Sequence, residues 1–448
     1  MDFGEKSHLV NELKMSSEPQ INDLAQHPAF GVVIWTLRMQ QAGDALLAAN
    51  LHHNLGDELA KMDKELPGAR LLAVEHLRRA LSFFGASTHP EDRLQSLRVL
   101  ARVLFDQRDW SAAETVLAEA VADDAPSPRF RTGGMVPPAS ALPDVLPTDR
   151  LSATGMAVPE VREPLRRIAS WRNAGTVAGL WITIAALFGV AAWLDHPLGY
   201  AALFVLMGPM FARLAILGHE AAHRLLFRNK RANDLVGRWL LDYPAFVPFD
   251  VYRRVHFAHH KDEFGPNEPD IPLYAGYPIP ASSWRRKLLR DAIGSSGWKN
   301  LKPLFTSLGS AQARPVVARI WATQLVIWAL IWAGTGHWWL YPLCWLGPWM
   351  TVWRVLNRLR AIAEHGGMER SKDRRRTTHH IRQSWAARFW IVPYRTGWHL
   401  AHHTDMGVPW RNLPAYHREL VEAGWVTDEY VYPSYRRFWK ACASGSPT

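Results

Sequence analysis

The chain has 448 residues, of which 48% are hydrophobic and 21% are charged, so wholesale disorder is excluded and one to three domains are expected. Two cysteines, Cys344 and Cys442, exclude a disulfide scaffold and a four-cysteine metal site. The net charge of +11 indicates a nucleic acid, an anionic membrane or an acidic protein as partner. The 22 tryptophans favour the membrane, because Trp prefers membrane–water interfaces.

Residues 1–125 predict a helical N-terminal domain, and its charged first 20 residues predict no signal peptide. Small and large apolar residues between Leu100 and Ala120 resemble a tetratricopeptide repeat, and Ala73, Leu77 and Ala80 repeat its second-helix pattern. The alternative is a generic amphipathic helical bundle. The resemblance implies a surface for a protein partner. Residues 126–165 are rich in proline and predict a linker.

Residues 166–448 contain four apolar segments, each about long enough to cross a bilayer core of ~30 Å. We therefore predict an all-α fold, with a four-span transmembrane domain after the helical N-terminal domain. The alternative is a soluble protein in which these segments are buried core helices. The predicted spans are residues 174–194, 197–217, 320–336 and 338–356.

The distribution of basic residues predicts the orientation of these spans. Sixteen Lys and Arg residues lie between His219 and Arg319, and another 16 follow from Arg354 onward, whereas the short turns after the first and third spans have none. Both termini and both large loops are therefore expected in the cytoplasm. This arrangement accounts for much of the positive charge without nucleic acid, which we do not expect as a partner. The run Arg374–Arg376 is expected to be a membrane-facing or solvated loop.

Three histidine clusters lie on the predicted cytoplasmic side. Spacings of three and four residues place imidazoles on one helix face, where several reach the same ion. Eight such ligands are too many for one ion with an open position, and they suit two metal ions; iron, zinc, copper and nickel all accept imidazole. His365, just after the fourth span, is a ninth candidate. The clusters are His219-Glu220-Ala-Ala-His223, His256-Phe-Ala-His259-His260 and His399-Leu-Ala-His402-His403.

The boxes HEAAH, HFAHH and HLAHH, with one helix hairpin before the first and another between the second and third, resemble the membrane fatty acid desaturase family. The resemblance covers about residues 165–440. It implies a cytoplasmic centre of two iron ions, O₂, an acyl or lipid substrate, and a separate electron donor such as ferredoxin. The family also implies that all nine histidines are iron ligands: His219, His223, His256, His259, His260, His365, His399, His402 and His403. Hydroxylases and ketolases share these boxes, so desaturation is the favoured reaction and hydroxylation or ketone formation the alternative.

Two further alternatives remain open from the residues. HEAAH also matches the zinc metalloprotease motif, with Glu220 as general base, but that motif leaves both other clusters unexplained. A non-enzymatic metal-binding or transport protein should carry polar residues inside its spans, and these have almost none.

Glu220 and Glu364 each stand beside a candidate ligand histidine. We interpret them as acceptors that orient a ligand imidazole, with plain surface acids as the alternative. Arg253, Arg254 and Arg395 adjoin the second and third boxes. They are candidates to contact an anionic headgroup, CoA or carrier protein, and their alternative role is anchoring to anionic lipid.

Overall fold

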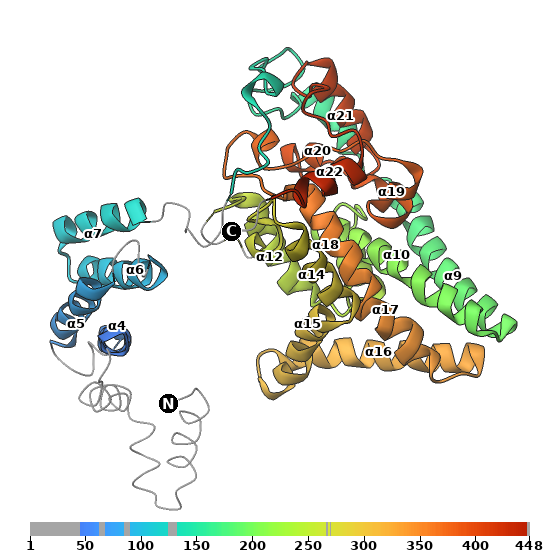
Figure 1. Cartoon of the computed structure of the whole chain (residues 1–448), viewed down its shortest axis with the longest axis horizontal. Coiled ribbons are helices and arrows are strands. Elements are labelled where there is room, and N and C mark those ends of the chain that lie inside the picture. The colour runs from blue at the N-terminus through green and yellow to red at the C-terminus, as the bar shows by residue number, and fades with distance from the viewer. Residues whose placement is uncertain are drawn as a thin grey trace, which may run out of the picture. The chain divides into compact units, whose positions relative to one another are not determined.

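The computed structural model describes residues 45–61, 68–84, 90–123, 132–265, 268 and 270–445. The chain forms two compact units, Met1–Arg129 and Phe130–Thr448. Within the described residues the regular structure is helical, and only two isolated β-bridges occur, so the all-α class is confirmed there (Figure 1). The prediction that no signal peptide is present falls outside the described residues.

The N-terminal unit contains four described helices. α4 (Ala45–Lys61) packs against α5 (Ala69–Phe83), and α6 (Pro90–Asp106) packs against α7 (Trp110–Asp123). Most positions of the predicted repeat pattern are buried, but Trp110 is 56% and Leu117 48% exposed, and the repeat assignment stays a prediction. The buried positions are Ala73, Leu77, Ala80, Leu100, Ala101, Leu104, Ala113 and Ala120.

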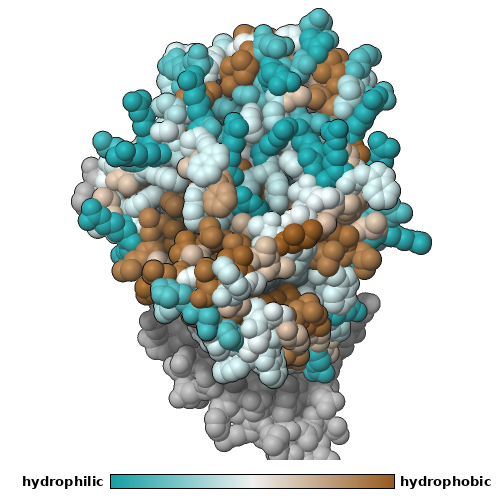
Figure 2. Space-filling model, turned by 90° about the vertical axis from the view of Figure 1, so that its right-hand side faces the viewer, coloured by the Kyte–Doolittle hydropathy of each residue, from teal (hydrophilic) through white to brown (hydrophobic). Residues whose placement is uncertain are grey.

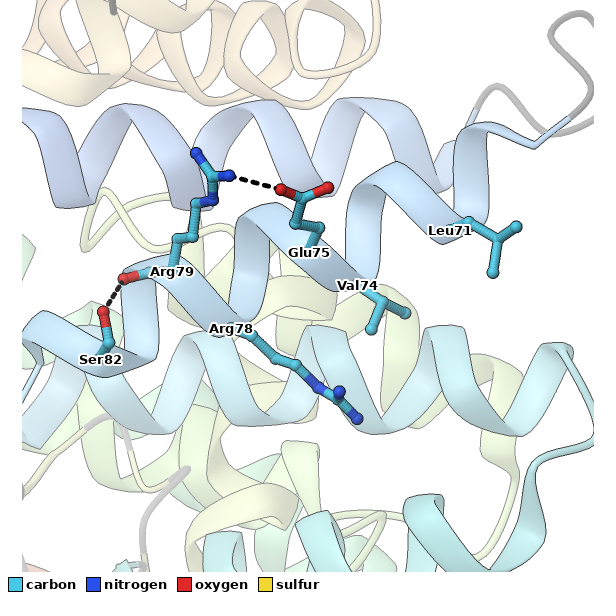
Figure 3. A pocket seen from close by; sticks show the side chains of 6 residues that line it. All are labelled: Leu71, Val74, Glu75, Arg78, Arg79 and Ser82. Atoms are coloured by element: carbon cyan, nitrogen blue, oxygen red, sulfur yellow. Dashed lines mark hydrogen bonds and ion pairs between the residues drawn. The ribbon is translucent and has the colours of Figure 1, made fainter.

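One face of α5 borders a shallow depression of about 400 Å³ (Figure 3). Glu75 and Arg79 form an ion pair of 2.5 Å along this face, and Ser82 donates a hydrogen bond to the Arg79 carbonyl oxygen at 2.7 Å. The polar side chains that line this depression therefore already form some of their hydrogen bonds within α5. The lining residues are Leu71, Val74, Glu75, Arg78, Arg79 and Ser82.

The described part of the predicted linker, residues 132–165, lies within the C-terminal unit rather than between two units. Its backbone is bonded to that unit, for example from the Met135 N–H to the Gly367 carbonyl oxygen at 2.9 Å. Leu151 and Ala157 are buried in one cluster with Leu400 and Tyr416. The segment has the proline content of a linker, but its apolar side chains are buried in the core of the C-terminal unit. Composition alone does not reveal this packing, because the partners lie far along the chain.

Three helical segments of the C-terminal unit are long and apolar enough to cross a membrane. The first, Pro159–Leu194, comprises α8 (Pro159–Leu165) and α9 (Ser170–Leu194); the others are α10 (Pro197–Ala222) and α16 (Arg314–Thr335). Each contains most of one predicted span. α10 runs past the predicted end at 217 into the first histidine box.

The fourth predicted span, residues 338–356, is interrupted. A π-helical turn over Tyr341–Leu346 leads into α17 (Gly347–Met350), and the helix then breaks at Thr351, where φ is −121° and ψ is −81°. Pro342 and Pro348 lie in this segment, and proline removes a backbone donor and disturbs a helix interior. α18 (Val352–His365) resumes beyond the break. The four-span topology therefore remains a proposal.

α10 is the central helix of the C-terminal unit. It contacts α9, α12, α17 and α18, and Figure 1 shows α9 alongside it. The C-terminal unit also contains α11 (Lys230–Val236), a π-helical turn (Gly237–Asp242), α12 (Phe249–Lys261), α13 (Ile271–Tyr274), α14 (Ala281–Ala292), α15 (Ser295–Thr306), α19 (Trp385–Trp390), α20 (His399–Thr404), α21 (Leu413–Glu422) and α22 (Tyr435–Cys442).

Large apolar side chains are exposed along α9 and α16. Trp193 is 82% exposed on α9, and Leu330 is 66% exposed on α16. Figure 2 shows hydrophobic side chains gathered over the lower half of one face, with hydrophilic side chains above them. Contiguous exposed apolar surface of this kind marks a membrane or protein contact, and with helices of spanning length it indicates membrane association.

Candidate metal centre

Four helix ends bring the nine predicted histidines together. His219 lies in the last turn of α10 and His223 follows at its C-terminal cap, while α12 supplies three histidines, α18 one and α20 three. The spacing within each box puts the rings on one side of a helix turn. All nine side chains are buried except that of His223, which is partly exposed.

Five of these side chains form a first set, which we call the five-histidine group: His219, His223, His256, His260 and His402. Their ring nitrogens all lie within 4.8 Å of one another. The Nε2 atom of His256 is 2.8 Å from that of His223 and 3.0 Å from that of His260. The Nε2 atoms of His260 and His402 are 3.1 Å apart. One ion can therefore be reached by the whole group.

A second set, the four-histidine group, contains His259, His365, His399 and His403. Ring nitrogens of His259, His365 and His403 lie within 4.8 Å of one another. The His399 Nε2 atom is 3.1 Å from that of His365 and 2.9 Å from that of His403. The two groups adjoin, because the rings of His260 and His403 stack with centroids 4.3 Å apart.

Hydrogen bonds on the far side of the rings define which nitrogen faces inward. His365 donates from Nδ1 to the Thr377 carbonyl oxygen at 2.8 Å, and His403 donates from Nδ1 to Glu263 Oε1 at 2.5 Å. The proton of each neutral ring is thus on Nδ1, which leaves a lone pair on Nε2. The Nε2 atoms of both rings face His399 Nε2 at hydrogen-bond distance. A proton on His399 Nε2 can satisfy only one of these two contacts, so the other brings two lone pairs together. A cation between the rings removes that repulsion, so this donor set fits a bound metal ion.

Burial keeps most of these imidazoles neutral. It lowers the pKa of His223 to about 3, and it lowers the pKa values of six others well below the usual value. In His259 burial also lowers the pKa, but the hydrogen bond and charge of Glu268 outweigh it, and the pKa is raised. Neutral imidazole is the form that binds metal, so the rings whose pKa is lowered can bind metal ions near neutral pH. The six histidines whose pKa is lowered well below the usual value are His256, His260, His365, His399, His402 and His403.

The two glutamates predicted to orient ligand imidazoles make no hydrogen bond to a histidine. Glu220 accepts from the Trp410 N–H at 3.3 Å, and its other oxygen is 3.9 Å from His219 Nδ1. Glu364 Oε1 lies 3.6 Å from His399 Nδ1. Both carboxylates are buried beside the site, and their orienting role stays a prediction.

Two other glutamates, which the sequence reasoning missed, do bond to these histidines. Glu263 accepts from His403, and Glu268 pairs with His259 Nδ1. Glu263 comes three residues after His260, so an acid one helical turn beyond the second box is a signal that was available. The pairing of Glu263 with His403 spans 140 positions and has no local signal.

The predicted headgroup-binding arginines differ in their surroundings. Arg253 donates to the carbonyl oxygens of Ala222 at 2.9 Å and Ala221 at 3.0 Å, so it caps the end of α10. Arg395 donates to the Arg411 carbonyl oxygen at 2.8 Å. Arg254 and Arg395 are exposed, whereas Arg253 is partly buried.

The expectation of a membrane-facing or solvated run at Arg374–Arg376 is wrong for the middle residue. Arg375 is 5% exposed and donates to the carbonyl oxygens of Pro143 and Trp425, both at 3.0 Å. Arg374 pairs with Glu263 at 2.5 Å. The three arginines therefore hold their loop in place, because each guanidinium bonds an acceptor from a distant part of the chain or from the loop itself.

Within the described residues, these observations define a helical, membrane-associated protein with a buried cluster of histidines that fits metal ions. Residues 195–439, more than half of the chain, match the sequence profile of the fatty acid desaturase family. The chain belongs to that family. The resemblance drawn from the three histidine boxes is thereby confirmed, and an oxidoreductase is favoured over the metalloprotease and the non-enzymatic scaffold.

Several characterised desaturases are similar to this chain. An sn-1 acyl-lipid omega-3 desaturase (ferredoxin) of Nostoc sp. (strain 36) is 30% identical over 25% of this chain and 30% of its own length. The dihydrorhizobitoxine desaturase of Bradyrhizobium elkanii is 26% identical over 51% of this chain and 67% of its own length. The chloroplastic omega-6 fatty acid desaturase of Spinacia oleracea is 27% identical over 52% of this chain and 55% of its own length. The chain thus spans between about a third and two thirds of these relatives.

Proposed function

We propose that the protein is a membrane oxidoreductase that uses O₂ and external electrons to desaturate an acyl or lipid chain. The observation that carries this proposal is the convergence of nine histidine side chains, from three boxes and α18, on two adjoining positions. In the reaction a –CH₂–CH₂– unit becomes –CH=CH–. O₂ takes up the two hydrogen atoms, two electrons and two protons, and two molecules of water form.

We assign one iron ion to the five-histidine group and one to the four-histidine group. Bound iron would supply the redox chemistry that activates O₂ and removes hydrogen from an unactivated C–H bond. The chain's own residues hold and orient it. Ring Nε2 atoms face the metal positions, while the Thr377 carbonyl oxygen and Glu263 keep the proton on Nδ1 of His365 and His403. Burial of the rings keeps bulk water from the metal positions.

The substrate and the donor are proposed from chemistry and from the relatives. The exposed apolar faces of α9 and α16 suit a lipid environment, from which an acyl chain would approach. One relative is named as an acyl-lipid desaturase that uses ferredoxin, and this supports a lipid substrate and a ferredoxin-like donor. Another is named for dihydrorhizobitoxine, so the family match alone does not fix the substrate.

The decisive experiment combines metal analysis with isotope labelling. Purified protein should contain two irons per chain and, with reduced ferredoxin, ferredoxin reductase and acyl lipids, should consume O₂. Under ¹⁸O₂, an unlabelled product two mass units lighter establishes desaturation, whereas label retained in the product establishes hydroxylation. Full activity with zinc alone, or no O₂ consumption with any donor and lipid, would overturn the proposal.

We further propose four spans with both termini and the metal centre in the cytoplasm. The support is the basic composition of both large loops and the apolar segment over 338–356. Reporter fusions at Pro147, His196, Ser310, His337 and the C-terminus should read in, out, in, out, in. A signal from the far side at Ser310 contradicts this topology.

The N-terminal unit is proposed to bind a protein partner, such as the electron donor or a carrier of the substrate. Its support is that its described helices form their own apolar core, which includes Leu55, Leu77, Leu100 and Leu104. A chain beginning at Phe130 should still bind iron and should lose the partner in a pull-down from its native membrane. Failure of this shortened chain to load iron would make the N-terminal unit part of the catalytic fold.

A further inference from the structure

The two histidine groups differ in what lies behind their rings. In the four-histidine group, His259 and His403 each bond a carboxylate through Nδ1, and His365 bonds a carbonyl oxygen. In the five-histidine group, the Nδ1 atoms of His219 and His402 have no hydrogen-bond partner among the described residues. The carboxylate of Glu220, at 3.9 Å from His219 Nδ1, is too distant for a hydrogen bond.

The two carboxylates are held rigidly in place. Glu263 is 2% exposed, and Arg374 grips it with one nitrogen while donating from another to the His260 carbonyl oxygen at 3.2 Å. Glu268 is 7% exposed and also accepts from the Phe264 N–H. Burying a carboxylate is costly unless it is paired and hydrogen-bonded, and both are. Each therefore reaches its histidine with a fixed geometry.

A carboxylate on Nδ1 fixes the tautomer and makes the opposite nitrogen a stronger electron donor. Among the described residues, two such pairs act on the four-histidine group and none acts on the five-histidine group. We infer that Glu263 and Glu268 are positioning residues that make the four-histidine position the tighter and more electron-rich of two inequivalent metal sites. The inference rests on the proposed two-metal function and deepens it.

Glu263 has one competing role, because its carboxylate lies near enough to His260 and His403 to form a ligand set with them. The hydrogen-bond pattern favours the positioning role. Glu263 Oε1 already accepts from both His403 Nδ1 and Arg374 Nη1, so those two bonds occupy the oxygen that faces the histidine. A ligand role would use Oε2, which is buried and has no hydrogen-bond partner among the described residues. A direct ligand and a positioning residue give different results when the carboxylate is replaced by an amide.

The test is a titration of metal-free, detergent-purified full-length protein with Co²⁺, whose visible absorption reports each site. Unaltered protein should bind two ions with separable affinities. Glu263→Gln and Glu268→Gln should each weaken the tighter site about 10–100-fold and leave the other site unchanged. Asp291→Asn is the matched control, because it removes a buried carboxylate that pairs with Arg358 rather than with a histidine, and both affinities should stay within about threefold of the unaltered protein.

A spectroscopic measurement on the unaltered protein guards against variants that fail to fold. Reconstitution with ⁵⁷Fe should give two Mössbauer doublets of equal area, and Glu263→Gln should shift one of them alone. A single doublet, equal weakening of both sites, or no change in either variant overturns the inference while leaving a two-metal protein intact. Complete loss of one ion in Glu263→Gln also overturns it, in favour of direct ligation. Failure to bind two ions at all instead contradicts the proposed function.

Discussion

α9 and α10 are neighbouring helices of nearly equal length and apolar content, yet they face different surroundings. In the most apolar 18-residue stretch of the segment that contains α9, 28% of the residues are buried, whereas 61% are buried in the corresponding stretch of α10. α9 exposes large side chains such as Trp193, whereas α10 packs on six other described α-helices and ends in the candidate metal centre. Apolar composition therefore shows that a helix can lie in a bilayer, but not whether it faces lipid or carries a site.

The sharpest test of this contrast uses the two ends of α10. His219, at the metal end, is buried, whereas His196, beside the α9 turn, is exposed and accepts a hydrogen bond from the Leu198 N–H at 3.2 Å. His219→Ala should reduce activity by more than about 100-fold, beyond the loss typical of residues that only support a ligand. Activity with reduced ferredoxin and the metal content of purified protein are the measurements.

His196→Ala is the matched control for that prediction. It removes a helix cap and should cost about 0.5–2 kcal/mol of stability, with metal content unchanged. Equal loss of metal in both variants would show that the two ends of α10 are not distinct.

The second contrast concerns packing. Phe211 on α10 is fully buried against the Trp345 ring, with centroids 5.2 Å apart, whereas Ile182 on α9 is 68% exposed. Phe211→Ala should lower the free energy of unfolding by about 3 kcal/mol or more, because it leaves a cavity. Ile182→Ala should change it by less than about 0.5 kcal/mol, since lipid or detergent fills the space. Denaturation in detergent measures both, and a similar loss for the two would mean that α9 is covered by protein.

The sequence predicts those features of the structure that depend on neighbouring residues, and it does not predict those that depend on contacts between distant residues. Three spans and the histidine boxes depend on periodicity and length within one segment, and the structure has three long apolar helices and gathers all nine histidines. Pro342 and Pro348 are a local signal for the interruption at Thr351 that the span prediction did not use. The packing of residues 132–165, by contrast, depends on partners far along the chain. The Glu263–His403 and Arg375–Pro143 contacts do so as well, and no local pattern specifies them.

Lowering the pH should destabilise the region beside the histidine groups more than α9, and this difference in stability is smaller than the preceding ones. Burial lowers the pKa of His379 to about 4, and its ring bonds the Gly366 carbonyl oxygen at 2.8 Å beside His365, whereas α9 contains no histidine. Because the folded pKa lies below the unfolded value, the stabilisation is complete above about pH 6.5 and is lost as the pH falls toward 4. From pH 7 to 5 this residue should contribute about 2 kcal/mol of destabilisation. His379→Gln should flatten the measured pH dependence by that amount, and an unchanged slope would contradict the assignment.

The smallest effects distinguish the glycines of the two helices. A Cβ at Gly218 of α10 would lie 1.9 Å from Asp242 Oδ1, whereas a Cβ at Gly189 of α9 meets nothing within 4 Å. Gly218→Ala should therefore destabilise by about 1–3 kcal/mol, because the buried Asp242 carboxylate must move. Gly189→Ala should be neutral or stabilise by up to about 1 kcal/mol, because alanine is the better helix former and the new methyl group points outward. The thermal unfolding midpoints of both variants, measured in one detergent, show whether each substitution stabilises or destabilises the protein. A destabilising Gly189→Ala would show that another helix or subunit approaches α9 as closely as Asp242 approaches α10, and the lipid-facing assignment of α9 would then fail.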